Sequence, residues 1–166
     1  MMGVNPPTAY FLLTDIVKLP RGSWVIQNAA NSGVGRATVT IAKSLGLRTV
    51  NVVRRDEVVA EMKALGGDVV LVDGPDLAKR VAAETGNAPV PLALVGVGDT
   101  SSMNLMNCLS ESGVLVSYGG MSRKPMVVRR AGSSSRSGRY AASGFCSGIS
   151  QPSRMSSPRC SITWRR

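Results

Sequence analysis

The chain has 166 residues, a length typical of one domain, and carries 20 basic and 10 acidic side chains, three cysteines and no histidine. Without histidine or a Cys-x-x-Cys spacing the usual zinc sites are nearly excluded, so neither zinc nor another metal is expected. The sequence has no apolar run of about 18 residues, no signal or transit peptide pattern and nothing that argues for a disulfide-forming compartment, which favours a cytoplasmic protein.

Residues 1–23 are predicted to form a linker helix that leads into the domain. Pro6 and Pro7 suit the first turn of a helix, and apolar residues then recur at spacings of three and four. Residues 19–22 end this segment with a turn. A helix in front of the first strand suggests that the chain arrives from another domain. The apolar stripe consists of Ala9, Leu12, Leu13, Ile16 and Val17.

Residues 24–53 predict a β-α-β unit. A short apolar strand at 24–26 is followed by a turn of small residues at 29–35, and a helix ends at Gly46 as a C-terminal cap would. The β-branched run at 49–53 forms the second strand. The helix carries apolar residues at spacings of three and four: Val34, Ala37, Ile41, Ala42 and Leu45.

The turn between the first strand and the helix predicts a dinucleotide site. Tight turns of this kind let a pyrophosphate approach the backbone amides at a helix N-terminus. The usual glycine pattern is met only as Ala30-x-Ser32-x-x-Gly35, with an additional Gly33. An ordinary strand-to-helix connection therefore remains an alternative interpretation.

The residues after the second strand favour NADP(H) over NAD(H). An NAD site places a carboxylate there to bind the ribose 2′-hydroxyl, whereas this chain has Arg54 and Arg55. Two guanidinium groups suit a 2′-phosphate, which a carboxylate would repel. The alternative is a solvated basic start of the next helix.

The remaining chain up to residue 128 continues the alternation of strand and helix. The five strands predicted in all indicate an α/β, Rossmann-type open parallel sheet with helices on both faces. We expect this partial NADP-binding domain to span residues 24–128 and to be incomplete at its C-terminal side. Cys108 falls in a predicted helix and is expected to pack rather than react. The elements are helices at 57–65, 75–84 and 100–109, and strands at 69–72, 92–95 and 114–118.

Residues 129–166 have a different composition. They hold eight arginines and no acid, whereas residues 1–128 hold 12 basic and 10 acidic side chains, so most of the net charge of +10 belongs to this tail. A segment without an apolar period is expected to be disordered. Its Arg, Ser, Pro, Gly, Cys and Trp are typical of GC-rich DNA translated in a shifted frame. Nucleic-acid binding through this tail is the alternative.

Four sequence words resemble the cofactor-binding domain of the medium-chain dehydrogenase/reductase superfamily, in particular its NADPH-dependent enoyl thioester reductases. They are GVNPPTAY at residues 3–10, VIQNAANSGVG at 25–35, GLRTVNVVR at 46–54 and YGGMS at 118–122. The resemblance covers residues 3–128 and ends at Arg129. It implies NADP(H) without zinc and, in a eukaryote, the mitochondrial matrix, where such enzymes act in fatty-acid synthesis.

The resemblance also implies which residues contact the cofactor. Asn31, Ser32, Gly33 and Val34 would contact the pyrophosphate, and Arg54, Arg55 and Asp56 the adenosine ribose phosphate. The run Tyr118, Gly119, Gly120 and Met121 would lie beside the nicotinamide, with Asn5 reaching it from the segment before the first strand.

In the family, a hydride passes from NADPH to a 2-enoyl thioester, and a tyrosine of a separate N-terminal domain assists. That domain and the last strand and helix of the sheet are not found in these 166 residues, so no catalytic residue is assigned. The Tyr-x-x-x-Lys motif of short-chain dehydrogenases is also absent. We expect an NADPH-binding fragment of such a reductase. The alternatives are a non-catalytic nucleotide-binding module and a nucleic-acid binder. An exposed sheet edge suggests self-association.

Overall fold

The computed structural model describes residues 4–123 and 139–142, the latter as backbone only. Six parallel strands form one sheet in the order β3-β2-β1-β4-β5-β6, which is the strand order of a Rossmann fold. The strands are β1 (Trp24–Gln27), β2 (Arg48–Val53), β3 (Val69–Val72), β4 (Leu92–Val95), β5 (Val114–Ser117) and β6 (Arg139–Ala142). The helices are α1 (Asn5–Thr14), α2 (Gly33–Ser44), the 3-10 helix η1 (Asp56–Val58), α3 (Val59–Ala64), α4 (Leu77–Thr85) and α5 (Asp99–Cys108).

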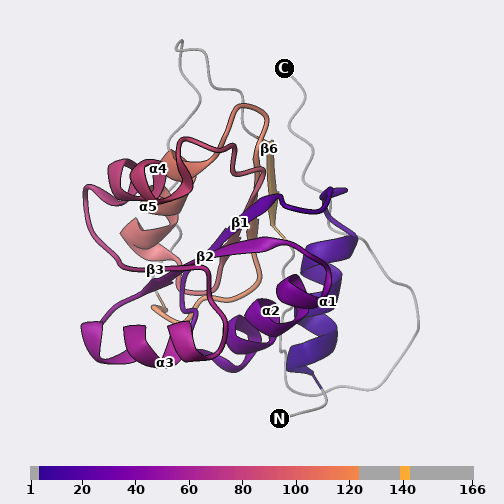
Figure 1. Ribbon diagram of the computed structural model, residues 1–166, viewed down its shortest axis with the longest axis horizontal. Coiled ribbons are helices and arrows are strands. Elements are labelled where there is room, and N and C mark those ends of the chain that lie inside the picture. Colours follow the sequence, from indigo (N-terminus) through magenta and orange to yellow (C-terminus); the bar gives the residue numbers. More distant parts are fainter. Residues whose placement is uncertain (1–3, 124–138, 143–166) are drawn as a thin grey trace.

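Helices cover both faces of the sheet (Figure 1). One core contains Ile26, Val52 and Leu115 from the strands, packed against α4 and α5. On the opposite face Val25 and Leu94 pack against α1 and α2. The central strands β1 and β4 are buried along their whole length, which explains why they read as continuous apolar runs rather than alternating ones.

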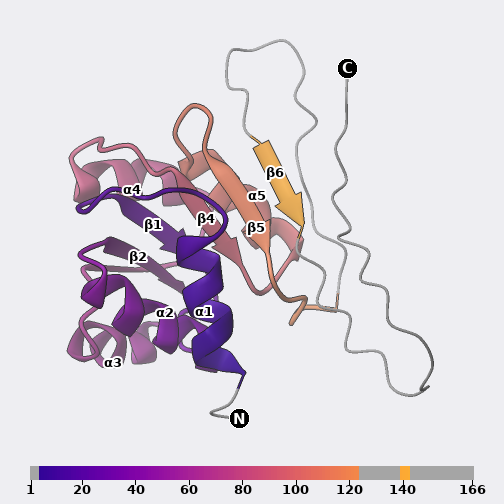
Figure 2. The same cartoon turned by 90° about the vertical axis from the view of Figure 1, so that its right-hand side faces the viewer.

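Helix α1 lies against the sheet beside α2 (Figure 2). Prolines occupy its first turn as predicted. Ala9 is buried, and Leu12 and Leu13 belong to the core beneath α1 and α2. The helix ends at Thr14, earlier than the apolar stripe suggests, but Ile16 still packs on that core. The predicted linker helix therefore contributes directly to the folded domain.

The β-α-β unit forms as the sequence predicts. The Ser32 side chain caps α2 by accepting a hydrogen bond from the Gly35 N–H at 3.1 Å. Gly46 follows the helix with φ of +72°, the left-handed conformation that glycine adopts most easily. Strand β1 then pairs with β2 in register from Trp24 opposite Arg48.

Strand β6 adds to the five strands that the sequence predicts. Residues 139–142, which lie within the segment 129–166 expected to be disordered, pair with β5 in parallel. Their sequence, Arg-Tyr-Ala-Ala, has no β-branched run, so side-chain pattern gave no strand signal, whereas pairing satisfies the backbone edge of β5. The rest of 129–166 lies outside the described residues, and the interpretations of this tail stay predictions.

Candidate cofactor-binding site

A cavity of about 210 Å³ opens at the carboxyl ends of the strands. Its walls come from four separate loops, which follow β1, β2, β4 and β5. Because β1 and β4 are neighbours whose connections run to opposite sides of the sheet, their ends separate and leave a crevice between them. The lining residues are Ala29, Asn31, Ser32, Arg54, Val97, Met121 and Ser122.

The β1–α2 turn brings backbone close to the start of α2. Ala29 adopts φ of +49°, a left-handed conformation that costs a residue with a side chain roughly 1 kcal/mol. A Cβ on Gly35 would lie 2.7 Å from the Ala29 carbonyl oxygen and closer still to that of Ala30. Gly35 therefore allows a helix–turn approach that no other residue permits. Asn31 and Ser32, two of the residues expected to contact a pyrophosphate, line the cavity.

Two further predicted residues, Gly33 and Val34, lie in the first turn of α2. A Cβ on Gly33 would overlap the Asn5 side-chain amide, so Gly33 and Asn5 are in direct contact. Asn5 is the first residue of α1, and the structure thus places the N-termini of α1 and α2 together. Val34 packs into the core beneath α1 and α2, which leaves only its backbone to face the turn.

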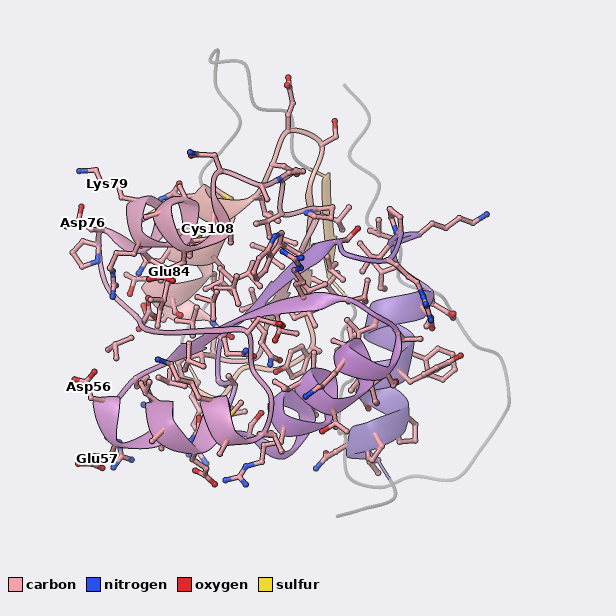
Figure 3. The ribbon with its side chains drawn as sticks, in the orientation of Figure 1. Asp56, Glu57, Asp76, Lys79, Glu84 and Cys108 are labelled. Atoms are coloured by element: carbon pink, nitrogen blue, oxygen red, sulfur yellow. The ribbon has the colours of Figure 1, made fainter. Side chains whose placement is uncertain are left out.

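The structure separates the two predicted arginines. Arg54 lines the cavity, whereas Arg55 is largely exposed and its guanidinium lies 3.8 Å from the Glu57 carboxylate. Asp56 lies beside Glu57 at the outer rim of the molecule, where η1 begins (Figure 3). Of these residues, only Arg54 is brought into the crevice.

The loop after β5 forms the opposite wall. Met121 lines the cavity and is 59% exposed, and Gly119 lies against the Gly96 carbonyl, 3.1 Å from where its Cβ would be. Gly120 has open space around it. These three positions fit a backbone that a ligand can approach closely.

Tyr118 follows β5 and packs against the core beneath α1 and α2, without lining the cavity itself. Its hydroxyl faces Gly96, only 2.7 Å from where a Cβ would be, and it is buried without a hydrogen bond of normal geometry. Burial raises the pKa of Tyr118, while the nearby Ser32 side chain acts in the opposite direction. The neutral hydroxyl is therefore a buried donor close to the N-terminus of α2.

Asn28 is a site residue that sequence reasoning missed. It is 1% exposed and its Oδ1 accepts hydrogen bonds from the Gly96 N–H at 2.7 Å and the Val97 N–H at 3.3 Å. Its Nδ2 donates to Ser101 Oγ at 3.0 Å. Asn28 thus joins the loop after β1 to the loop after β4 across the crevice.

Gln27, the last residue of β1, supports the first turn of α2. Its Nε2 donates to the Gly35 carbonyl at 3.0 Å and to Asn51 Oδ1 at 2.8 Å. Asn51 in turn donates to Thr49 Oγ1, and Asp68 accepts from the Thr49 N–H at 2.8 Å. This buried polar chain fixes the first turn of α2 relative to β2.

The other candidates lie outside the crevice. Cys108 on α5 (Figure 3) donates to the Asn104 carbonyl, and burial together with the Asp73 carboxylate raises its pKa to about 12, as suits a packing thiol.

Among residues 4–123, no three His, Cys, Asp or Glu side chains gather where they could hold a metal ion. No described helix is long and apolar enough to cross a membrane. A second cavity, of about 390 Å³, lies at the amino ends of β4 and β5 and includes none of the predicted residues.

The strand order, the capped turn and the crevice at the switch point define a Rossmann-type dinucleotide-binding domain. The family model described as zinc-binding dehydrogenase matches residues 33–150. The chain belongs to this family, as the cofactor-binding domain of a medium-chain dehydrogenase/reductase. The match continues past Arg129, where the resemblance found in the sequence ends.

Curated relatives have names that agree with the sequence resemblance. A mitochondrial enoyl-[acyl-carrier-protein] reductase of Dictyostelium discoideum is 42% identical over 136 residues, which cover 76% of this chain and 38% of the relative. The human mitochondrial enoyl-[acyl-carrier-protein] reductase is 43% identical over 132 residues, covering 76% and 35%. The chain therefore spans little more than a third of the length of these relatives.

Solved structures of enoyl thioester reductases share the fold. The complex of Etr1p with NADP and crotonyl-CoA superposes with a TM-score of 0.77 at 32% identity, covering 86% of this chain and 42% of that one. The Etr1p/Etr2p heterodimer from Candida tropicalis gives 0.78 at 32% identity, covering 87% and 43%.

Proposed function

We propose that the chain binds NADPH in the crevice between the loops after β1 and β4. The observation that carries this proposal is that the turn before α2, Arg54 and the loop after β5 all line the same cavity. A helix N-terminus attracts the pyrophosphate through its free N–H groups and its dipole. A guanidinium at the end of β2 suits a 2′-phosphate.

The residues present fit this cofactor. The carbonyls of Ala29 and Ala30 leave no room for a Cβ at Gly35, as expected in a tight turn that lets a pyrophosphate approach the backbone. The buried Tyr118 hydroxyl has no protein partner of normal geometry, so a bound polar group could use it. Asn31, Ser32, Gly33 and Val34 would hold the pyrophosphate, and Arg54 the 2′-phosphate with Arg55 and Asp56 at the rim. Tyr118 to Met121 and Asn5 would enclose the nicotinamide.

The activity proposed for the full-length protein is reduction of the 2,3 double bond of an enoyl thioester. NADPH, when bound, supplies the hydride for such a reduction. The names of the relatives and the NADP and crotonyl-CoA complex of Etr1p support this substrate class. The described residues contribute the binding and orientation of the cofactor, and no catalytic residue is assigned among them.

Location and assembly are proposed from the same relatives. Their names place them in mitochondria, which supports the mitochondrial matrix for this protein if its source is eukaryotic. The Etr1p/Etr2p heterodimer supports self-association. Absence of zinc and the two alternative functions, a non-catalytic nucleotide-binding module and nucleic-acid binding by the tail, stay predictions.

Titration of the purified 166-residue chain with NADPH, followed by cofactor fluorescence, tests the proposal. Saturable binding at least about tenfold tighter than that of NADH is expected, because a charge-assisted bond to the 2′-phosphate is worth roughly 1.5–3 kcal/mol. Equal affinity for both cofactors would refute the NADP assignment. A folded chain that binds neither would refute cofactor binding by this chain.

A further inference from the structure

The loop that follows β4 is hydrogen-bonded by the side chain of Asn28, the first residue after β1. We propose that Asn28 is a positioning residue that sets the geometry of the nicotinamide end of the crevice without lining it. This inference rests on the proposed binding of NADPH. It assigns to a buried amide the control of one half of the cofactor site.

Both polar atoms of the Asn28 side chain form hydrogen bonds to the loop or to the start of α5. Its Oδ1 accepts from the N–H groups of Gly96 and Val97, and its Nδ2 donates to Ser101 Oγ in the first turn of α5. The backbone N–H of Asn28 also extends the β1–β4 pairing by donating to the Leu94 carbonyl at 3.2 Å. One residue therefore fixes the loop and the start of α5 relative to β1.

The same two loop residues hold the wall formed after β5. The Gly96 carbonyl accepts from the Met121 N–H at 3.1 Å, and the Val97 carbonyl accepts from the Ser122 N–H at 3.0 Å. Val97, Met121 and Ser122 all line the cavity. A relay of hydrogen bonds thus runs from Asn28 through residues 96–97 to residues 121–122, because the N–H groups of Gly96 and Val97 bond to Asn28 and their carbonyls to residues 121–122.

The loop needs this restraint because its backbone is unusual. Asp99, a residue with a side chain, has φ of +57°, a left-handed conformation that persists only where the surroundings hold it. Removing the Asn28 amide would leave the buried Gly96 N–H without its acceptor, and the loop would relax toward another arrangement.

The adenosine end of the crevice is held by other contacts. The Ser32 side chain caps α2, the Gln27 amide holds the Gly35 carbonyl, and Arg54 follows β2. None of these contacts passes through Asn28. Loss of Asn28 should therefore weaken the nicotinamide half of the site and spare the adenosine half.

Two ligands separate these halves. Wild-type chain and the Asn28→Ala variant are titrated calorimetrically with NADPH and with 2′,5′-ADP, which has the 2′-phosphate but no nicotinamide. The expected result is NADPH affinity weakened on the order of tenfold, with 2′,5′-ADP affinity changed by less than about twofold. Asn104→Ala is the matched control, because Asn104 also anchors α5 by an amide, to Asp73 at 2.9 Å, outside the relay. It should leave the ratio of the two affinities unchanged.

Amide hydrogen exchange gives a readout that does not depend on a ligand. In Asn28→Ala, exchange should accelerate at Met121 and Ser122, although neither contacts the substituted side chain. If this variant does not fold, Ser101→Ala removes only the partner of Asn28 Nδ2 and should show the same selective loss in smaller degree.

Equal weakening of both ligands, or no weakening of NADPH, would overturn the positioning role. Unchanged exchange at Met121 and Ser122 would overturn the relay. If wild-type chain binds neither ligand, the proposed function fails, and the exchange pattern still decides whether Asn28 holds the loop after β5.

Discussion

Arg54 and Arg55 are adjacent in sequence but differ in surroundings, which predicts different effects on cofactor choice. Both residues are exposed, but only Arg54 lines the crevice, whereas Arg55 lies near Glu57. Arg54→Ala is expected to weaken NADPH binding by roughly tenfold to a hundredfold and to leave NADH binding nearly unchanged, because only NADPH has the 2′-phosphate. Arg55→Ala should cost about threefold or less, since exposed ion pairs contribute little.

Parallel titrations of both variants with NADPH and NADH measure this difference. Arg55→Ala is the matched control, as it removes the same charge one residue away. A larger loss from Arg55→Ala than from Arg54→Ala would mean that the phosphate binds at the rim rather than in the crevice.

Gly35 gives a prediction about stability. Gly35→Ala would force a Cβ against two backbone carbonyls, which cannot move as a side chain end could. We expect the free energy of unfolding to fall by about 2 kcal/mol or more. Gly120→Ala should be nearly neutral, because nothing lies within 4 Å of the added atom. Urea unfolding of both variants compares them, and equal stabilities would show that the turn adapts.

Cys108 predicts a dependence of stability on pH. Its pKa is raised from 9.0 to about 12 by burial and by Asp73. Above about pH 9 the unfolded chain loses a proton that the folded chain retains, so the free energy of unfolding should fall as pH rises. The slope is at most about 1.4 kcal/mol per pH unit, and less because the side chain is only partly buried.

Comparison with Cys108→Ala isolates this contribution, since lysines and tyrosines titrate in the same range. Urea unfolding between about pH 8 and pH 11 should show a smaller slope in the variant. Identical slopes would mean that the thiol titrates normally in the folded protein.

At the scale of single residues, the sequence indicated those candidate site residues whose place follows from a local motif. Asn31, Ser32 and Arg54 were expected in the site because a turn and a strand end have recognisable positions. Asn28 and Gln27 were not, because their partners, Gly96 and Asn51, are distant in sequence. The separation of Arg54 from Arg55 likewise depends on where β2 ends relative to the crevice, which no pattern specifies.

The elements were predicted most closely where a strand is a continuous apolar run. Strands β3 and β4 have the expected bounds for this reason, although β4 is buried throughout and β3 only over Val69 and Val70. Helix α4 begins two residues later than expected, at Leu77, because Pro75 precedes its cap rather than its first turn. Strand β6 was missed because an edge strand is selected by backbone pairing with β5.

Helix α1 illustrates why an element can belong to a domain despite its position before the first strand. Leu13 is 2% exposed in the core beneath α1 and α2, and Phe11 on the same helix is 59% exposed. Leu13→Ala should lower the free energy of unfolding of the whole domain by about 2–4 kcal/mol, whereas Phe11→Ala should cost less than about 1 kcal/mol.

Urea unfolding followed by circular dichroism tests this difference. A single transition that shifts in Leu13→Ala would show that α1 unfolds together with the sheet. A small effect of Leu13→Ala, equal to that of Phe11→Ala, would mean that α1 is an independent linker.

At the scale of the whole molecule, the site exists only because the sheet is ordered. The four loops that line the crevice come from residues 29–122, and parallel pairing brings their strand ends to one edge. The order β3-β2-β1-β4 places the crevice between β1 and β4, so its position follows from topology and not from any one motif. Sequence alternation predicted an open parallel sheet with helices on both faces, whereas the strand order and the walls of the cavity are seen only in the structure.

This dependence predicts that cofactor binding stabilises the entire domain. A ligand that binds only the folded state adds RT ln(1 + [L]/Kd), or about 2.7 kcal/mol at a hundredfold excess over Kd. For a domain of this size the midpoint of thermal unfolding should rise by on the order of 10 °C. Because the walls come from both halves of the sheet, we expect one transition that shifts as a whole.

Scanning calorimetry at several NADPH concentrations measures this shift in the midpoint of thermal unfolding. Arg54→Ala should need roughly tenfold to a hundredfold more NADPH for the same rise, in proportion to its weaker binding. A transition that splits, with only its later part shifted by NADPH, would show that the cofactor site folds as a unit separate from the rest of the sheet.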